Sequence, residues 1–355
     1  MKIAISTGGG DAPGLNAVIR GAVLSAVNRH WQCLGVRRGF AGLLGEDLLV
    51  TLGASAVRGI THLGGTILGT TNRGDPFKWR EQRPDGAWSE RDRSDEVVTA
   101  FRAFELDALV LIGGDGSLAI ARLLMAKGMP IVGVPKTIDN DVGGTVATFG
   151  FDTAVATATD AIDKLHSTAE SHERVMVVEV MGRNAGFIAV HSGVAGTADV
   201  ILIPEIPFDM ARVCDKIRQR EAQGRRFSIV VVAEGAVPKG GTESYLDPEH
   251  RRLGGIAEKV AGAIEQLTGK ETRALVLGHL QRGGSPTTFD RLLGLRFGAA
   301  AVRLVAQRKF GMMVALRPPD IVAVPIDEVL SSPKRVPLDS DVIATAREIG
   351  ISFGD

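Results

Sequence analysis

Six short apolar runs, each the length of a buried strand, constrain the fold of this chain more than any other feature of its sequence. They span residues 2–7, 108–112, 130–134, 174–180, 228–233 and 274–277. Continuous runs of Val, Ile and Leu are typical of parallel strands that are buried on both faces. Apolar stripes with helical spacing separate several of them, at residues 16–28, 118–126, 152–165 and 288–307. This alternation predicts an α/β fold with a mostly parallel sheet.

Each apolar run is followed by a loop rich in glycine and polar residues. The loops span residues 8–14, 113–117, 135–141, 181–184, 234–235 and 278–286. Ligands of open α/β sheets bind beyond the carboxyl ends of the strands, so we expect all six loops on one edge, forming one site. Glycine supplies 44 of the 355 residues, a share of about 12% against an average of about 7%, and these glycines occur in short clusters between the apolar runs.

Composition and charge exclude several classes of function. The 41 basic and 41 acidic residues cancel, so the chain lacks the charge of a general nucleic-acid binder. The apolar runs fall far short of the ~20 residues that span a bilayer. Two cysteines, Cys33 and Cys214, make no disulfide framework and favour a reducing compartment. Residues 1–6 lead directly into a glycine loop without a visible signal peptide. We therefore expect a cytoplasmic protein without a nucleic-acid or membrane partner.

The loop at residues 113–117 has the chemistry of a phosphate site. Glycine lets backbone N–H groups approach phosphate oxygens, and the start of the following helix favours an anion. Asp115 offers the carboxylate oxygen that Mg²⁺ prefers. The structural alternative is a tight turn in which Ser117 caps the helix. The loop at residues 8–14 allows the same two interpretations, and the chain has no Walker A motif.

Two further loops carry candidate groups for catalysis and for anion binding. Asp139 and Asp141 place two carboxylates at a strand end, where one could take a proton from a hydroxyl and the other assist it; an Asx-rich turn is the alternative. His279 and Arg282 stand among glycines, and arginine forks bind phosphate oxygens in pairs. The sequence allows two interpretations of these residues: they form a clamp for a sugar phosphate, or they are solvated surface charges.

Taken together, the loop motifs resemble those of the 6-phosphofructokinases. The resemblance covers residues 1–310, and the specific segments are 9–14, 113–117, 135–141, 181–183 and 278–286. The probability that five motifs occur in the family's order by chance is very small, and the last motif is highly specific. The resemblance implies phosphoryl transfer from Mg-ATP to the 1-hydroxyl of fructose 6-phosphate, giving fructose 1,6-bisphosphate in glycolysis.

The resemblance also assigns roles to individual residues. The residues implied to bind the phosphoryl donor are Gly10, Arg73, Gly74, Gly114, Asp115, Gly116 and Ser117, with Asp115 on Mg²⁺. Those implied in catalysis are Asp139 as the base, Asp141, Thr137, Arg183, Arg73 and Lys136. Those implied to bind the sugar phosphate are Thr137, Ile138, Asp139, Arg174, Met181, Gly182, Arg183, Glu234, Arg273, His279, Leu280, Gln281 and Arg282.

The family's architecture implies two Rossmann-like lobes with mostly parallel sheets and the active site in the cleft between them. We expect a donor lobe of residues 1–138 plus about 253–307, and a sugar-phosphate lobe of residues 139–252 plus about 308–355. In the family, the arginines matching Arg174 and Arg273 come from a neighbouring subunit. The resemblance thus implies a homodimer or homotetramer with shared active sites.

The identity of the donor rests on two positions. Pyrophosphate-dependent relatives typically carry Asp where this chain has Gly116 and Lys where it has Lys136, whereas many ATP-dependent relatives carry Gly at both. A carboxylate at position 116 would repel the nucleotide α-phosphate, at a cost of about 1–4 kcal/mol for charges ~4 Å apart. We therefore expect ATP, with pyrophosphate as the alternative. A non-catalytic nucleotide or sugar-phosphate sensor is a remote alternative, since such a protein would usually lack one of the acidic or basic site residues.

Overall fold

The computed structural model describes residues 1–45, 49–72, 74–247 and 252–355. Helices and mostly parallel sheets alternate along the chain, which confirms the predicted α/β class. The chain divides into two compact units. Unit 1 comprises Met1–Thr137, Val142–Asp152 and Arg282–Pro333, and unit 2 comprises Ile138–Asp141, Thr153–Gln281 and Lys334–Asp355.

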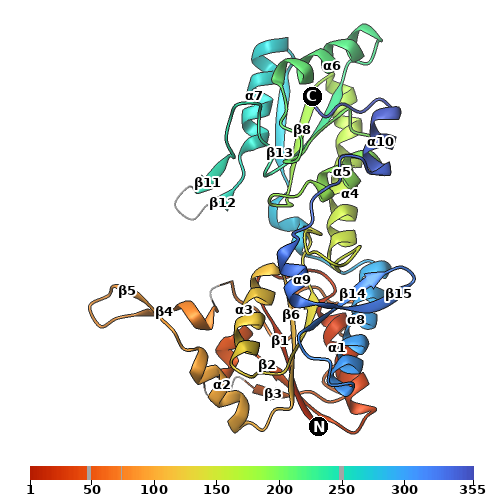
Figure 1. The fold of residues 1–355 in the computed structure, drawn as a ribbon. Coiled ribbons are helices and arrows are strands. Elements are labelled where there is room, and N and C mark those ends of the chain that lie inside the picture. The colour runs from red at the N-terminus through yellow and green to blue at the C-terminus, as the bar shows by residue number, and fades with distance from the viewer. Residues whose placement is uncertain (46–48, 73, 248–251) are drawn as a thin grey trace. The chain divides into compact units, whose positions relative to one another are not determined.

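Unit 1 is built on a seven-stranded sheet with the order β15-β14-β7-β6-β1-β2-β3 (Figure 1). The strands are β1 (Lys2–Thr7), β2 (Gln32–Val36), β3 (Leu49–Thr51), β6 (Ala108–Gly113), β7 (Ile131–Pro135), β14 (Met312–Arg317) and β15 (Asp320–Pro325). Neighbours from β14 to β2 pair in parallel, and the edge strands β3 and β15 pair antiparallel. The loops after β1, β6 and β7 therefore leave the sheet on the same edge.

Helices cover both faces of this sheet because successive strand residues point to opposite sides. Ile3 and Ile5 of β1 pack with α1 (Leu15–Val27) and α8 (Thr288–Ala306), whereas Ala4 packs with α2 (Ser94–Ala103) and α3 (Asp115–Ala126). The short helix α9 (Ile326–Ser331) follows β15. Glycine allows α1 and α8 to approach closely: a β-carbon at Gly21 would lie 2.5 Å from the carbonyl oxygen of Leu295.

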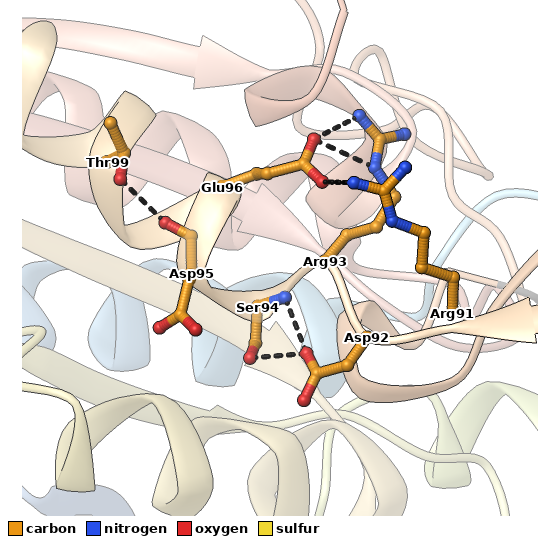
Figure 2. Close-up of polar contacts among 7 residues, drawn as sticks. All are labelled: Arg91, Asp92, Arg93, Ser94, Asp95, Glu96 and Thr99. Carbon is orange, nitrogen blue, oxygen red and sulfur yellow. Dashed lines mark hydrogen bonds and ion pairs between the residues drawn. The ribbon is translucent and has the colours of Figure 1, made fainter.

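The polar stretch at residues 80–95 lies in a small hairpin and the start of α2. The 3₁₀ helix η2 (Pro76–Lys78) leads into β4 (Trp79–Gln82), which pairs antiparallel with β5 (Trp88–Arg91). Figure 2 shows how the chain then enters α2: Asp92 accepts hydrogen bonds from the backbone nitrogen and hydroxyl of Ser94, at 2.8 and 2.6 Å. Glu96 pairs with Arg91 and Arg93. Ion pairs at the surface of this kind contribute little to stability.

Unit 2 is built on a smaller parallel sheet with the order β13-β8-β10-β9. Its strands are β8 (Val175–Val180), β9 (Val200–Leu202), β10 (Ser228–Ala233) and β13 (Thr272–Val276). Its helices are most of α4 (Phe151–His172), α5 (Phe187–Ala195), α6 (Met210–Ala222), α7 (Ile256–Thr268) and α10 (Asp341–Glu348). In Figure 1, α7 lies on one side of this sheet, and α4 and α5 lie on the other. A two-stranded ribbon, β11 (Tyr245–Asp247) with β12 (Arg252–Leu253), precedes α7.

The two units depart from the expected lobes in three places, and the first is Val142–Asp152, which belongs to unit 1. Residues 256–276 form α7 and β13 and belong to unit 2, because β13 pairs with β8. Residues 312–331 belong to unit 1, because β14 pairs with β7. The expectation of six loops on one sheet edge was wrong for the same reason. β1, β6 and β7 lie in the large sheet, and β8, β10 and β13 lie in the small one. Each sheet thus presents three of the loops.

Candidate active site

In unit 1 the loop after β1 packs against the loop after β6. The backbone nitrogen of Gly8 donates to the carbonyl oxygen of Ile112 at 2.9 Å. A β-carbon at Gly8 would lie 2.7 Å from Oγ of Ser117, and one at Gly113 would overlap the Ser117 side chain. Gly8 and Gly113 are therefore required by close packing, and this packing brings the two predicted phosphate loops together.

Lys136, at the end of β7, brings a cation to the same place. Its side chain is 4% exposed, and Nζ donates a hydrogen bond to the carbonyl oxygen of Gly10. A β-carbon at Gly9 would lie 3.3 Å from Nζ. Burial of an ammonium group is costly unless it is paired. Its position beside a glycine turn gives unit 1 a fixed positive charge suited to polyphosphate oxygens.

Arg282 adds a second cation to this loop. Its NH1 nitrogen donates to the carbonyl oxygen of Asp11 at 3.2 Å and would lie 3.3 Å from a β-carbon at Gly10. Arg282 belongs to unit 1, whereas the preceding residues of the predicted clamp, 279–281, belong to unit 2. The predicted clamp is thus divided between the two units. His279 and Leu280 are exposed, and Gln281 is fully buried.

Asp115 is the predicted magnesium ligand. It is the first residue of α3 and is exposed, and its Oδ1 accepts a hydrogen bond from the backbone nitrogen of Gly116 at 2.7 Å. No group of three or more His, Cys, Asp or Glu side chains suited to a metal occurs in the part of the chain that the structure describes. Magnesium is commonly held by one or two carboxylates together with substrate phosphates and water. One exposed carboxylate beside a phosphate loop fits that mode of binding.

The remaining donor residues lie around these loops. Gly114 precedes α3, and a β-carbon there would lie 3.3 Å from the carbonyl oxygen of Lys136. A β-carbon at Gly116 would meet no atom within 4 Å, so this position has open space. Gly74 lies close to Thr71, since a β-carbon there would be 2.7 Å from its Cγ2. Arg73, predicted for both donor binding and catalysis, lies outside the described residues.

In unit 2 the central relationship is between Asp139 and Arg183. Asp139 is 3% exposed, and its Oδ2 lies 3.9 Å from Nε of Arg183, whose side chain is 62% exposed. The pair joins the segment after β7 to the loop after β8. A buried carboxylate next to an exposed guanidinium is an arrangement in which one group can accept a proton and the other can bind an anion.

Glu234, at the end of β10, holds the loop that carries Arg183. Its Oε1 accepts hydrogen bonds from the backbone nitrogens of Gly182 and Arg183, at 3.2 and 2.9 Å. Burial raises the pKa of Glu234 above its usual value, and the negative charge of Asp139 raises it further, against the lowering effect of the bond from Arg183. The loops after β7, β8 and β10 therefore meet around one set of charges.

The other predicted sugar-binding residues of this region are positioned by hydrogen bonds of the backbone, by close packing or by burial. Oε1 of Gln281 accepts a 2.8 Å hydrogen bond from the nitrogen of Met181. Gly182 has a φ of 142°, and a β-carbon there would lie 2.5 Å from the carbonyl oxygen of Ala185. Ile138 is fully buried. On the unit 1 side, the carbonyl oxygen of Thr137 accepts a 2.8 Å bond from Thr148.

The structure does not bring Arg174 and Arg273 to this site within their own chain. Arg174 precedes β8, whereas Met181 follows it, so a six-residue strand separates them, about 20 Å at ~3.3 Å per residue. Arg273 lies near the start of the parallel neighbour β13. Both pair with Glu271, with nitrogen-to-oxygen distances of 2.7 and 2.5 Å.

Sequence reasoning missed two residues that hold the site. Glu179 is 3% exposed within β8 and accepts hydrogen bonds from the backbone nitrogens of Gly255 and Ala257, which fixes the start of α7. An acidic residue inside an apolar strand was the available signal. Lys334 donates from Nζ to Oδ1 of Asn140 at 3.0 Å. Its sequence surroundings carry no motif, so no signal was available.

Comparison with known proteins identifies close relatives over the whole chain. The family model described as "Phosphofructokinase" matches residues 2–305. The ATP-dependent 6-phosphofructokinase of Chloroflexus aggregans is 54% identical over 358 residues, covering 100% of this chain and 98% of that protein. ATP-dependent 6-phosphofructokinase 2 of Clostridium perfringens is 47% identical over 361 residues, with 100% and 98% covered.

Solved structures show the same fold. Pichia pastoris phosphofructokinase in the T-state superposes with a TM-score of 0.81 at 31% identity, covering 98% of this chain and 36% of the Pichia chain. The pyrophosphate-dependent phosphofructokinase of Marinobacter aquaeolei gives a TM-score of 0.79 at 24% identity, covering 99% of this chain and 88% of that one, and shows the fold alone. Among the described residues, no helix is long and apolar enough to cross a membrane.

Proposed function

Because this chain belongs to the phosphofructokinase family, we propose that it transfers the terminal phosphoryl group of Mg-ATP to the 1-hydroxyl of fructose 6-phosphate. The products are ADP and fructose 1,6-bisphosphate. Relatives that are 54% and 47% identical over the full chain carry the name ATP-dependent 6-phosphofructokinase. The single observation that carries the proposal is the buried Asp139 carboxylate, 3.9 Å from the Arg183 guanidinium at a strand end.

On the donor side, the loops of unit 1 bind the polyphosphate. The start of α3 presents backbone N–H groups, and Lys136 and Arg282 supply positive charge beside the glycine turn. Gly114, Ser117 and Gly74 belong to the same donor site, and Arg73 is proposed to join it. Asp115 would hold Mg²⁺, which neutralises charge on the phosphate oxygens when it is bound.

On the acceptor side, Asp139 takes the proton of the sugar 1-hydroxyl. A carboxylate is a weak base for an alcohol, but it suffices because bond breaking to the leaving phosphate runs ahead of proton transfer in a loose transition state. Arg183 stabilises charge on the transferring group, and Thr137 and Asp141 support Asp139 as its neighbours. Met181, Gly182, Glu234 and Ile138 shape the sugar site.

The 6-phosphate of the sugar is proposed to bind His279, Leu280, Gln281 and Arg282, with Arg174 and Arg273 supplied by a neighbouring subunit. The support for the shared site is that Arg174 and Arg273 lie at the far end of the strands from Met181 and Glu234 of their own chain. The protein would then work as a homodimer or homotetramer. The cysteines Cys33 and Cys214 are buried and free, as fits a cytoplasmic protein.

Pyrophosphate is the second candidate donor, because Lys136 is the residue type that pyrophosphate-dependent relatives typically carry at this position. The ammonium group beside Gly9 and Gly10 would neutralise the charge of either donor. Gly116 favours ATP, because the open space at this position leaves room for the nucleotide and adds no negative charge. The names of the relatives support the same choice.

The test is an assay of the purified protein with fructose 6-phosphate and Mg²⁺, supplied with either ATP or pyrophosphate. The product is identified by ³¹P NMR. We expect fructose 1,6-bisphosphate with ATP and little with pyrophosphate. Product with pyrophosphate alone would overturn the choice of donor. Binding of fructose 6-phosphate without product from either donor would instead identify a sensor.

A further inference from the structure

The last segment of unit 2 begins with a residue that contacts the proposed catalytic segment. Residues Ile138–Asp141 belong to unit 2 but are flanked on both sides by residues of unit 1. The segment Lys334–Asp355 returns to unit 2 near the end of the chain. The family model ends at residue 305, so Lys334 lies outside the part of the chain that carries the matched motifs.

Lys334 makes two hydrogen bonds to the residues that follow Asp139. Its Nζ donates to Oδ1 of Asn140 at 3.0 Å, and its backbone nitrogen donates to the carbonyl oxygen of Asp141 at 2.9 Å. Asn140 has a φ of 55°, in the left-handed region that residues other than glycine seldom adopt. Such a conformation persists where surrounding contacts enforce it. One bond from Lys334 thus holds the side chain of Asn140 and the other holds the peptide group of Asp141, directly after the proposed base.

The same segment is also tied to the loop that carries Arg183. Two residues after Lys334, the backbone nitrogen of Val336 donates to Oε1 of Glu205 at 3.0 Å. Glu205 also accepts from the backbone nitrogen of Gly186, with both oxygens at 3.1 Å. Gly186 precedes α5, and Nζ of Lys334 lies 5.1 Å from the ring centre of Phe187, the first residue of that helix. The segment therefore contacts both partners of the Asp139–Arg183 pair through their neighbours.

The buried positive charge of Lys334 lowers the stability of the folded protein. Burial lowers its pKa to about 8, against the opposing effect of the Asp141 carboxylate. The pKa of His191 in α5 responds to the same ammonium. Burial lowers the pKa of His191, and the positive charge of Lys334 lowers it further. A lysine whose folded-state pKa is depressed destabilises the fold at neutral pH. Packing alone would be served better by an apolar side chain of similar length.

We propose that Lys334 is a positioning residue, which fixes Asn140 and thereby holds the Asp139 carboxylate in the orientation needed to take the proton of the sugar hydroxyl. This inference rests on the proposed function. It assigns to the segment after residue 333 a part in catalysis without contact with the substrate. A misplacement of about 1 Å at a reacting group can lower the rate about 100-fold, so a hydrogen bond to the next residue is sufficient to control turnover.

The experiment compares Lys334→Met, Lys334→Arg and Arg335→Met with the wild-type protein. Met keeps the length and apolar contacts of the lysine stem, and Arg restores a cation able to reach Asn140. Arg335 is the exposed neighbouring cation and serves as the matched control. For each variant we measure kcat, KM for fructose 6-phosphate, the thermal midpoint, and hydrogen exchange at the amides of residues 138–142 without substrate.

We expect Lys334→Met to lower kcat by about 10- to 100-fold, with KM within about threefold of wild type, an unchanged or raised thermal midpoint, and faster exchange at residues 138–142. Lys334→Arg should recover part of kcat, and Arg335→Met should resemble wild type. The inference is overturned if Lys334→Met retains kcat, or if kcat falls only in step with the thermal midpoint. An inactive wild-type protein would overturn the proposed function instead, and the exchange data would still test whether Lys334 holds the segment.

A double-mutant cycle with Asn140→Gly tests the route of the effect. Glycine accepts the left-handed backbone but removes the side chain that Lys334 contacts. If Lys334 acts through Asn140, the double variant should have a kcat close to that of the poorer single variant. Fully multiplicative losses would show independent effects and overturn this route.

Discussion

The backbone nitrogen of Arg183 donates a 2.9 Å hydrogen bond to Oε1 of Glu234, so one buried carboxylate holds the peptide group that carries the proposed anion-binding side chain. Arg183 has a φ of 51°, in the left-handed region, and the bond stabilises that conformation. The same oxygen accepts from Gly182. Both bonds need an acceptor oxygen and neither needs a charge.

Replacement of Glu234 by Gln should therefore stabilise the protein at pH 7. Burial raises the pKa of the carboxyl group, so its ionised form costs stability above that pKa. Gln keeps an acceptor oxygen for the backbone and removes the charge. Each kcal/mol gained would raise the thermal midpoint by about 2–4 °C in a chain of this size class.

The pH dependence of this gain has a definite sign. As pH falls through the raised pKa, the wild-type carboxyl takes up its proton first in the folded state, so the difference from Glu234→Gln should shrink as the pH approaches the ordinary pKa of a glutamate side chain. Thermal midpoints of both proteins between pH 4.5 and 8 measure this, with Glu258→Gln at an exposed position as the control. A gain that grew at low pH would contradict the assignment.

Substitution Gly116→Asp should impair the use of ATP more than the use of pyrophosphate. The position has open space, so the new side chain fits without displacing other atoms. Its carboxylate would repel the nucleotide phosphates by about 1–4 kcal/mol, which predicts a loss of roughly fivefold or more in kcat/KM for ATP. The measurement is kcat/KM for each donor at saturating fructose 6-phosphate.

The matched control is Gly262→Asp. Gly262 is an exposed helical glycine of α7 that also has open space, and it belongs to unit 2, whereas the donor loops belong to unit 1. Its substitution adds the same charge and should leave both donors unaffected. Equal losses of ATP and pyrophosphate activity in Gly116→Asp would refute the argument from space and charge.

A shared active site predicts complementation between two inactive proteins. Arg174→Ala removes a phosphate ligand that is proposed to serve a neighbouring subunit, and Asp139→Ala removes the base. A mixed oligomer contains sites in which an intact Asp139 meets a partner with an intact Arg174. Mixing the variants under conditions of subunit exchange should restore a substantial part of wild-type activity. An activity equal to the average of the separate variants would show that Arg174 does not act across subunits.

The crossing of α1 and α8 predicts opposite effects for two glycine-to-alanine substitutions. A β-carbon at Gly298 would overlap the carbonyl oxygen of Val18, so Gly298→Ala should cost about 1–3 kcal/mol through overpacking. Gly262→Ala meets open space and should gain about 0.5–1 kcal/mol from helix propensity. Denaturant unfolding measures both. Equal effects would contradict the close approach of the two helices.

The elements that sequence predicted best are those whose signal is local. Strands β1 and β10 match the predicted residues because an uninterrupted apolar run determines a buried parallel strand. Strand β2 was missed because Gly35 interrupts its apolar pattern. A β-carbon at position 35 would collide with the side chain of Leu68, and only the folded structure reveals this contact.

The features that sequence could not predict depend on contacts between distant segments. Nothing local in residues 312–317 specifies that β14 pairs with β7. The bond from Lys334 to Asn140 joins residues 194 positions apart. The individual site residues were placed by resemblance to a family, and their roles stay predictions. The structure adds the contacts that hold them, such as those of Glu179 and Glu234.

The most direct test of the whole account is the turnover of Asp139→Ala with fructose 6-phosphate and Mg-ATP. Loss of the base should lower kcat by about 100-fold or more, while isothermal calorimetry of the same variant shows nearly unchanged affinity for fructose 6-phosphate. Turnover at the wild-type rate in a correctly folded variant would contradict the assignment of Asp139, and with it the proposed acceptor site.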